Sequence, residues 1–199
     1  MTAPSSASDA ADPTPATDPF DAADAVVYDL DGTLLDLVVD WGRVADDVAA
    51  VYAEHALVPP TDDLWTLLDV ATEYGIGAEV EAAIADHERD GAVRSRLLPL
   101  GERLHTDTDD RPAAVCSLNC ETACRTALRE HEIDAAVEAV VGRDTTETRK
   151  PEPGSLLAAV TSLGVDPERA VFVGDSASDA VTAERAGVPF VWVSELVGE

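Results

Sequence analysis

Residues 26–36 read VVYDLDGTLLD, an apolar run that ends in two aspartates and a glycine. This pattern is typical of a buried strand followed by a loop, and ligands of open parallel sheets bind at that end of a strand. Asp29 and Asp31 are two positions apart, so both can point the same way. Their repulsion at about 4 Å is roughly 4 kcal/mol at an effective dielectric near 20. A divalent cation with oxygen ligands would relieve it; the alternative is a plain acidic turn.

Outward from this stretch, short apolar runs alternate with helical patterns. The expected strands are residues 25–29, 113–116, 137–141, 170–173 and 190–193. Strands that alternate with helices predict an α/β fold with a doubly wound, parallel, Rossmann-like sheet of about five strands. The carboxyl ends of these strands would then meet at one edge of the sheet.

Residues 37–97 differ, because their apolar residues recur at helical spacing. We expect an all-helical domain here, with no strand and a third helix that stops near Gly91. It would be inserted into an α/β core domain made of residues 22–36 and 98–199. Its two tryptophans, Trp41 and Trp65, are expected to form its core rather than bind substrate. Residues 1–21 are acidic and contain four prolines, which predicts a disordered tail.

The chain has 199 residues and a formal net charge of -27, from 40 acids and 13 bases. Such a surface repels nucleic acid and anionic membranes, so neither is an expected partner. No apolar stretch is long enough to span a membrane, and the N-terminus lacks a signal-peptide pattern. We therefore expect a cytoplasmic protein, either a monomer or a homodimer.

The basic residues are unusual, because Lys150 is the only lysine and the others are arginines. A lysine-poor, acidic chain is typical of halophilic proteins in molar salt, where the Debye length of about 3 Å screens self-repulsion. We expect unfolding or inactivation in dilute buffer, measured as melting temperature and activity with and without molar KCl. Full activity and unchanged melting without salt would instead indicate a merely acidic mesophilic protein.

Three cysteines, Cys116, Cys120 and Cys124, lie four positions apart. An odd number at helical spacing does not indicate a disulfide framework. Zinc binding is possible, but no histidine lies closer than His131. Buried, reduced thiols are the favoured interpretation.

Polar residues follow four of the expected strands. They are Asp29 with Asp31, Ser117, Lys150 in the loop after the third strand, and Asp175 with Asp179. Together they provide acids for a metal, an acid that can be a nucleophile, a hydroxyl donor and one cation. Phosphoryl transfer needs these groups, because its catalysis consists mostly of positioning and charge stabilisation.

Four segments together resemble the motifs of the haloacid dehalogenase (HAD) superfamily. Residues 29–36 (DLDGTLLD) resemble its first motif and Ser117 is similar to its second, while residues 150–153 (KPEP) and 174–179 (GDSASD) resemble the third and fourth. They occur in the family's order, over residues 25–193. The helical insertion is similar to the cap of the phosphoglycolate phosphatase-like branch.

This resemblance implies roles for the acids. Asp29 would be the nucleophile and form an aspartyl-phosphate. Asp31 would protonate the leaving alcohol and then deprotonate the water that hydrolyses the intermediate. Asp29, the backbone carbonyl of Asp31, and Asp175 would hold Mg²⁺, with Asp179 supporting it directly or through water.

The resemblance also implies a phosphate-binding set: Gly32, Thr33, Ser117, Asn119 and Lys150. Ser117 and Lys150 would bind phosphoryl oxygens, together with backbone amides around residues 30, 32 and 119, and Thr33 would steady the loop. Phosphatases of this type often have asparagine directly after the serine. Leu118 stands there in this chain, with Asn119 one position later, so the second phosphate contact stays open.

The function implied is a Mg²⁺-dependent phosphatase acting on a small phosphorylated metabolite, either phosphoglycolate-like or a sugar phosphate. A phosphomutase of the same fold is an alternative. A haloacid dehalogenase is disfavoured by Asp31, because a departing halide needs no proton. A non-catalytic binding protein that keeps the fold is disfavoured because all the core chemical residues are present.

Overall fold

The computed structural model describes residues 19–106 and 111–197. Most of the expected disordered tail, residues 1–18, lies outside the described residues. Its last part differs from expectation, because residues Pro19–Ala22 form a short helix, α1. Within the described residues, no helix combines the length and the apolar character needed to cross a membrane.

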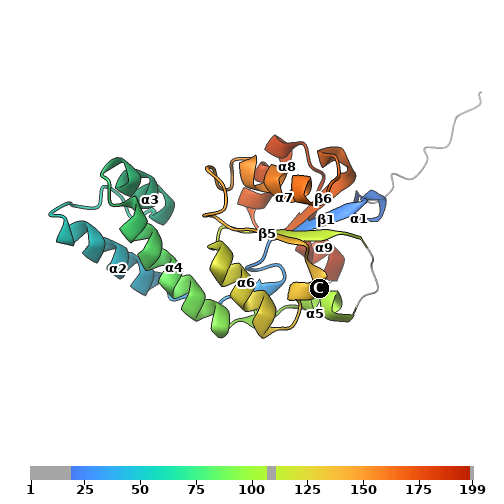
Figure 1. Cartoon of the computed structure of the whole chain (residues 1–199), viewed down its shortest axis with the longest axis horizontal. Helices are drawn as coiled ribbons and strands as arrows, with labels where there is room; N and C mark the ends of the chain where they lie inside the picture. Colours follow the sequence, from blue (N-terminus) through green and yellow to red (C-terminus); the bar gives the residue numbers. More distant parts are fainter. Residues whose placement is uncertain (1–18, 107–110, 198–199) are drawn as a thin grey trace, which may run out of the picture.

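A five-stranded sheet with the order β5-β4-β1-β6-β7 lies among helices in the larger part of the molecule (Figure 1), and every neighbouring pair is parallel. Its strands are β1 (Ala25–Tyr28), β4 (Ala113–Cys116), β5 (Ala139–Val141), β6 (Ala170–Gly174) and β7 (Phe190–Trp192). This confirms the expected α/β fold class. The strand order reverses beside β1, which places a switch point, the usual ligand position, at its carboxyl end.

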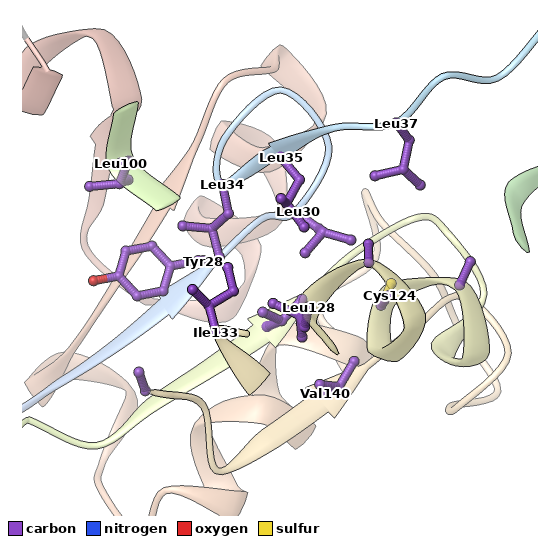
Figure 2. Packing of buried hydrophobic residues seen from close by; sticks show 14 of the residues in the cluster. Tyr28, Leu30, Leu34, Leu35, Leu37, Leu100, Cys124, Leu128, Ile133 and Val140 are labelled. Atoms are coloured by element: carbon purple, nitrogen blue, oxygen red, sulfur yellow. The ribbon is translucent and has the colours of Figure 1, made fainter. Parts of the chain in front are cut away.

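Alternate residues of β1 face opposite sides of the sheet and enter two apolar cores. Val26 and Tyr28 join one core with Leu34 and Leu128, as Figure 2 shows in part, while Val27 joins the other with Leu156. The helices of the first side are α5 (Pro99–Thr106), α6 (Glu121–Glu130) and α9 (Val193–Val197), and those of the second are α7 (Gly154–Ser162) and α8 (Ala177–Ala186). Short 3₁₀ turns cover Asp134–Ala136 and Pro167–Arg169. The three cysteines are buried and free, as expected.

Helices α2 (Trp41–Glu54), α3 (Leu64–Glu73) and α4 (Gly77–Val93) form a helical region beside the sheet (Figure 1). They enclose a separate core in which the buried Tyr52 hydroxyl donates to the Leu67 carbonyl at 2.6 Å. Helix α4 ends at Val93, two residues beyond Gly91 and so near where it was expected to stop. A Cβ on Gly91 would lie 2.7 Å from Val39 Cγ2, so this glycine allows the helix to approach the preceding segment closely.

A two-stranded antiparallel ribbon, β2 (Leu35–Asp36) with β3 (Arg96–Leu97), connects the helical region to the sheet domain. The expectation of no strand within residues 37–97 is therefore wrong. An ion pair between Asp36 and Arg96 accompanies the pairing. The chain consequently enters and leaves the helical region at adjacent positions.

Candidate active site

The loop after β1 is held tightly against β6. The Asp29 amide donates to the Val173 carbonyl at 2.8 Å, which continues the sheet by one residue. Gly32 then adopts a φ of 82°, and a Cβ there would lie 2.2 Å from Asp175 Oδ2. Glycine is therefore required both by the turn and by the approach of Asp175. The Gly32 amide, expected to bind phosphate, donates to the Leu35 carbonyl in this conformation.

Three carboxylates gather at this edge of the sheet. Oxygens of Asp29, Asp175 and Asp179 all lie within 4.8 Å of one another. Asp179 is fully buried, and its Oδ2 accepts from the Ser176 amide and hydroxyl at 3.1 and 2.6 Å, in a capping box that begins α8. Asp175 is exposed at the cluster's outer side. Clustered carboxylate oxygens are suitable ligands for a hard divalent cation, so the donor set fits the Mg²⁺ expectation.

Lys150 completes the cluster from the loop before α7. Its Nζ donates to Asp29 Oδ1 at 2.8 Å and to Asp179 Oδ1 at 2.5 Å, and the side chain is buried. Burial alone would lower the lysine pKa, but the two carboxylates outweigh it and raise that pKa. Burial raises the pKa of Asp29, opposed by Lys150 and reinforced by Asp179. The ammonium therefore compensates negative charge that the buried acids could not otherwise hold.

Asp31 lies in the same cavity but outside the three-carboxylate cluster. Its Oδ1 accepts from the Leu37 amide at 2.8 Å. Burial raises its pKa, the hydrogen bond from Leu37 opposes this, and nearby carboxylates such as Asp36 raise it further. A carboxyl group with a raised pKa is suited to proton transfer, because it exchanges a proton closer to neutral pH.

Ser117 and Asn119 follow β4 and are both buried at the rim of the cavity. The Ser117 hydroxyl donates to Asn119 Oδ1 at 3.1 Å, and the backbone N–H of Asn119 donates to Ser117 Oγ at 3.2 Å. The backbone N–H of Asn119, which was expected to bind phosphate, therefore donates to Ser117 in this conformation. The expected loop-steadying role of Thr33 is not visible at its side chain, whose buried Oγ1 has no hydrogen-bond partner among the described residues.

Two tryptophans of the helical region line the cavity. Trp41 and Trp65 enclose a volume of about 250 Å³ together with Asp29, Lys150 and Asp175. Trp41 is 43% exposed, so the expectation that it belongs to the helical core is wrong, whereas Trp65 packs partly against that core. Both lie at the beginnings of their helices, α2 and α3, and these beginnings therefore border the cavity.

Known proteins similar in sequence to this chain indicate its family. Residues 108–193 match the model of the haloacid dehalogenase-like hydrolases. The chain is 32% identical to a phosphoglycolate phosphatase of Rhodospirillum rubrum, over 85% of this chain and 79% of that protein. The chain belongs to the haloacid dehalogenase-like hydrolases. The expected enzyme class, a phosphoric monoester hydrolase, is confirmed with it.

Solved structures of this family share the fold. A HAD-superfamily hydrolase from Geobacter sulfurreducens is 25% identical, with a TM-score of 0.59 over 86% of this chain and 89% of that one. CbbY from Rhodobacter sphaeroides, solved in complex with phosphate, has a TM-score of 0.62 over 85% of each chain. At 17% identity the second likeness supports the fold alone.

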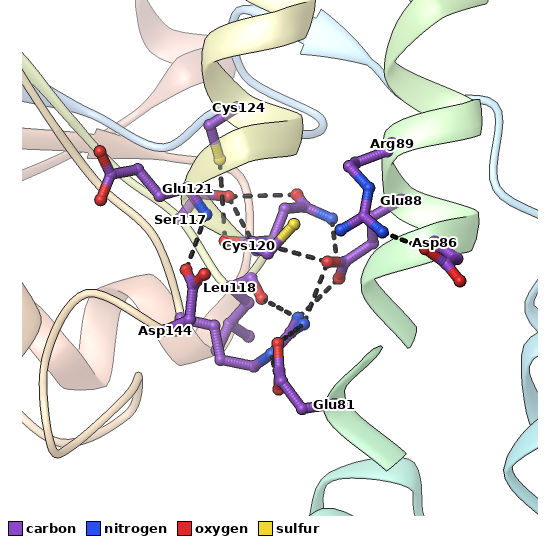
Figure 3. A network of polar contacts seen from close by, with 12 residues as sticks. Glu81, Asp86, Glu88, Arg89, Ser117, Leu118, Cys120, Glu121, Cys124 and Asp144 are labelled. Carbon is purple, nitrogen blue, oxygen red and sulfur yellow. Dashed lines mark hydrogen bonds and ion pairs between the residues drawn. The ribbon is translucent and has the colours of Figure 1, made fainter. Parts of the chain in front are cut away.

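This hydrolase also has a buried ion-pair network that the motifs of the sequence do not indicate. Glu88 of α4 is fully buried and accepts from the Cys120 amide at 2.9 Å and from Asn119 Nδ2 at 3.4 Å. Figure 3 shows Glu88 pointing from α4 towards the loop that carries Leu118 and Cys120. The helical region therefore directly holds the loop that follows the hydroxyl donor Ser117.

Arg143, after β5, completes this network. Its guanidinium contacts Glu88 Oε1 at 2.6 Å, Glu81 Oε1 at 2.6 Å and the Leu118 carbonyl at 2.6 Å. Burial acts to lower the arginine pKa, but the two glutamates outweigh it and raise that pKa. One signal could have found Glu88. It follows Val80 and Ile84 at intervals of four, so it lies on the buried stripe of the helix.

Proposed function

We propose that this phosphatase of the haloacid dehalogenase-like family requires Mg²⁺ and hydrolyses a small phosphorylated metabolite through an aspartyl-phosphate. One observation carries the proposal: the ammonium of Lys150 contacts Asp29 and Asp179, which cluster with Asp175. These residues come from three distant segments of the chain and meet at the switch point of the sheet. Candidate substrates are phosphoglycolate-like compounds and sugar phosphates.

In the first step, a carboxylate oxygen of Asp29 attacks phosphorus and the ester P–O bond breaks. Asp31 gives its proton to the departing alkoxide, a role that its raised pKa supports. In the second step, water attacks the phosphorus of the aspartyl-phosphate and loses a proton to Asp31. The Asp29–phosphorus bond breaks and inorganic phosphate leaves.

Positive charge and hydrogen-bond donors would hold the phosphoryl group in place. Lys150 and the Ser117 hydroxyl line the cavity and would bind its oxygens. Mg²⁺ held by Asp29, Asp175 and the Asp31 carbonyl, with support from Asp179, would neutralise the carboxylates and polarise the phosphoryl oxygens. The proposed helical cap, residues 37–97, would cover the group from the other side, which the position of its tryptophans supports.

The proposed Mg²⁺ site makes a thermodynamic prediction. Adding Mg²⁺ to chelator-treated protein should raise the melting temperature, because a cation that binds only the folded state stabilises it by about 2.7 kcal/mol at a hundredfold excess over its Kd. Thermal unfolding in molar KCl, with and without Mg²⁺, measures this. The shift should disappear in Asp175→Asn and persist in Asp134→Asn, whose carboxylate is exposed elsewhere. An equal Mg²⁺ shift in both variants would contradict the site.

Release of inorganic phosphate from a panel of phosphorylated metabolites tests the reaction itself. A phosphatase releases phosphate from at least one of them in the presence of Mg²⁺. A phosphomutase would instead return the phosphoryl group to a sugar, and isomerised sugar phosphate without free phosphate would overturn the proposal.

A further inference from the structure

The cavity that holds the acids adjoins a second one, and the same two tryptophans line both. The second cavity has a volume of about 340 Å³ and is lined by Trp41, Ala45, Asp62, Leu64 and Trp65. All of its lining residues belong to the helical region, and it shares both tryptophans with the proposed phosphate site, so the non-phosphate part of a substrate would lie there. The residues that line it therefore indicate which kind of leaving group the site would accept.

From this lining we infer that the substrate is the phosphate monoester of a neutral monosaccharide, with its ring against Trp41 and Trp65, rather than a phosphorylated carboxylic acid. The inference rests on the proposed phosphatase function and specifies its substrate class. It makes Trp41, Trp65 and Asp62 the residues that determine specificity.

Charge is the first argument. Among the described residues that line the two cavities, Lys150 is the one cation, and it already contacts Asp29 and Asp179. A substrate carboxylate in the second cavity would gain no counter-ion from its lining, and it would lie in a pocket whose one charged lining residue, Asp62, is also an acid. A neutral leaving group has neither cost.

The neighbouring arginines are already paired. Arg143 contacts Glu81 and Glu88, and Arg149 donates to Asp69 at 2.7 Å and to the Trp65 carbonyl at 2.8 Å. Their guanidinium carbons lie 5.1 and 5.9 Å from the centroid of the Trp65 ring. These cations therefore hold the indole in place instead of lining the cavities.

Shape and polarity are the second argument. A sugar ring has a flat C–H face that packs on an indole, and hydroxyl groups that donate to a carboxylate such as Asp62. Trp41 is 43% exposed, so it offers apolar surface that a ring would cover. The second cavity lies at the lower end of the roughly 300–1,000 Å³ typical of small-molecule sites, which suits one ring.

The first test compares kcat/KM for glucose 6-phosphate, 2-phosphoglycolate and adenosine monophosphate, with Mg²⁺ in molar KCl. We expect the sugar phosphate to exceed the other two by about tenfold or more. A value for 2-phosphoglycolate or the nucleotide at or above that of the sugar phosphate overturns the inference while leaving the phosphatase proposal intact. Failure to hydrolyse even p-nitrophenyl phosphate would instead reject the proposed function.

Variants test the same contacts. Trp41→Ala should lower kcat/KM for glucose 6-phosphate about tenfold more than it lowers that for 2-phosphoglycolate, because only the sugar ring loses apolar contact with the indole. Asp62→Lys should raise kcat/KM for 2-phosphoglycolate relative to that for glucose 6-phosphate, because it supplies a counter-ion, and the gain should shrink as KCl is raised because residue 62 is exposed. Tyr74→Ala, which removes a 53% exposed aromatic residue elsewhere in the helical region, is the matched control and should change neither. Equal losses for both substrates in Trp41→Ala, or no gain in Asp62→Lys, would overturn the inference.

Discussion

Asp29→Asn is expected to lower the rate of p-nitrophenyl phosphate hydrolysis by about a thousandfold or more, because an amide cannot replace a carboxylate nucleophile. The substitution also removes the charge of one of the three clustered carboxylates, which is one of the two negative charges that contact the Lys150 ammonium. Asp179 remains as the other acceptor at 2.5 Å, so the buried lysine keeps a counter-ion. The loss should therefore be one of chemistry rather than of folding.

The measurement is phosphate release with Mg²⁺ in molar KCl, combined with the melting temperature of each variant. Asp46→Asn, which changes an exposed aspartate of α2, is the matched control and should retain the wild-type rate. If Asp29→Asn and the wild-type protein hydrolyse the ester at equal rates, the aspartyl-phosphate mechanism is rejected.

Arg143→Met is expected to lower the free energy of unfolding by about 3–5 kcal/mol, because it leaves a buried carboxylate without its cation. Glu88 is fully buried, and Arg143 contacts both of its carboxylate oxygens. The same change frees the Leu118 carbonyl, so the loop after Ser117 loses one of its supports. The double variant Glu88→Gln/Arg143→Met should recover part of the loss, since it removes the unpaired charge.

Urea unfolding in molar KCl measures this effect. Arg125→Met is the matched control, because Arg125 pairs with Glu121 on the exposed face of α6, with side chains that are 48% and 33% exposed. Surface pairs of this kind contribute about 0–1 kcal/mol. Equal costs for Arg143→Met and Arg125→Met would show that the buried network has no special role in stability.

The sheet and its acidic edge could be predicted from sequence because their signals are local. The run that ends at Tyr28 is apolar, and Asp29, Asp31 and Gly32 follow it directly. Parallel strands bring distant loops to one edge, so the alternation of strands and helices is enough to place Lys150 and Asp175 near Asp29.

Other features could not be read from the sequence because they depend on partners far along the chain. Strand β3 has two residues and no alternating pattern, and it forms because Leu97 pairs with Leu35. Trp41 has the helical spacing of a core residue, yet it faces the cavity because the orientation of α2 is set by packing against α4. Arg143 is one arginine among many in the sequence. Its structural role depends on its ion pair with Glu88, which lies 55 positions earlier.

The ribbon of β2 and β3 has a consequence for how such enzymes can be altered. Since the two chain crossings pair side by side at Leu35 and Leu97, the intervening helices can be exchanged for others without re-routing the sheet. A transplanted helical insert would, however, have to replace the contacts that α4 makes with Arg143. Unless it supplied an acid at the place of Glu88, Arg143 would lose a counter-ion and the loop beside the acidic edge of the sheet would lose a support. Interchangeability of the insert is thus limited by the acids of α4 that pair with Arg143.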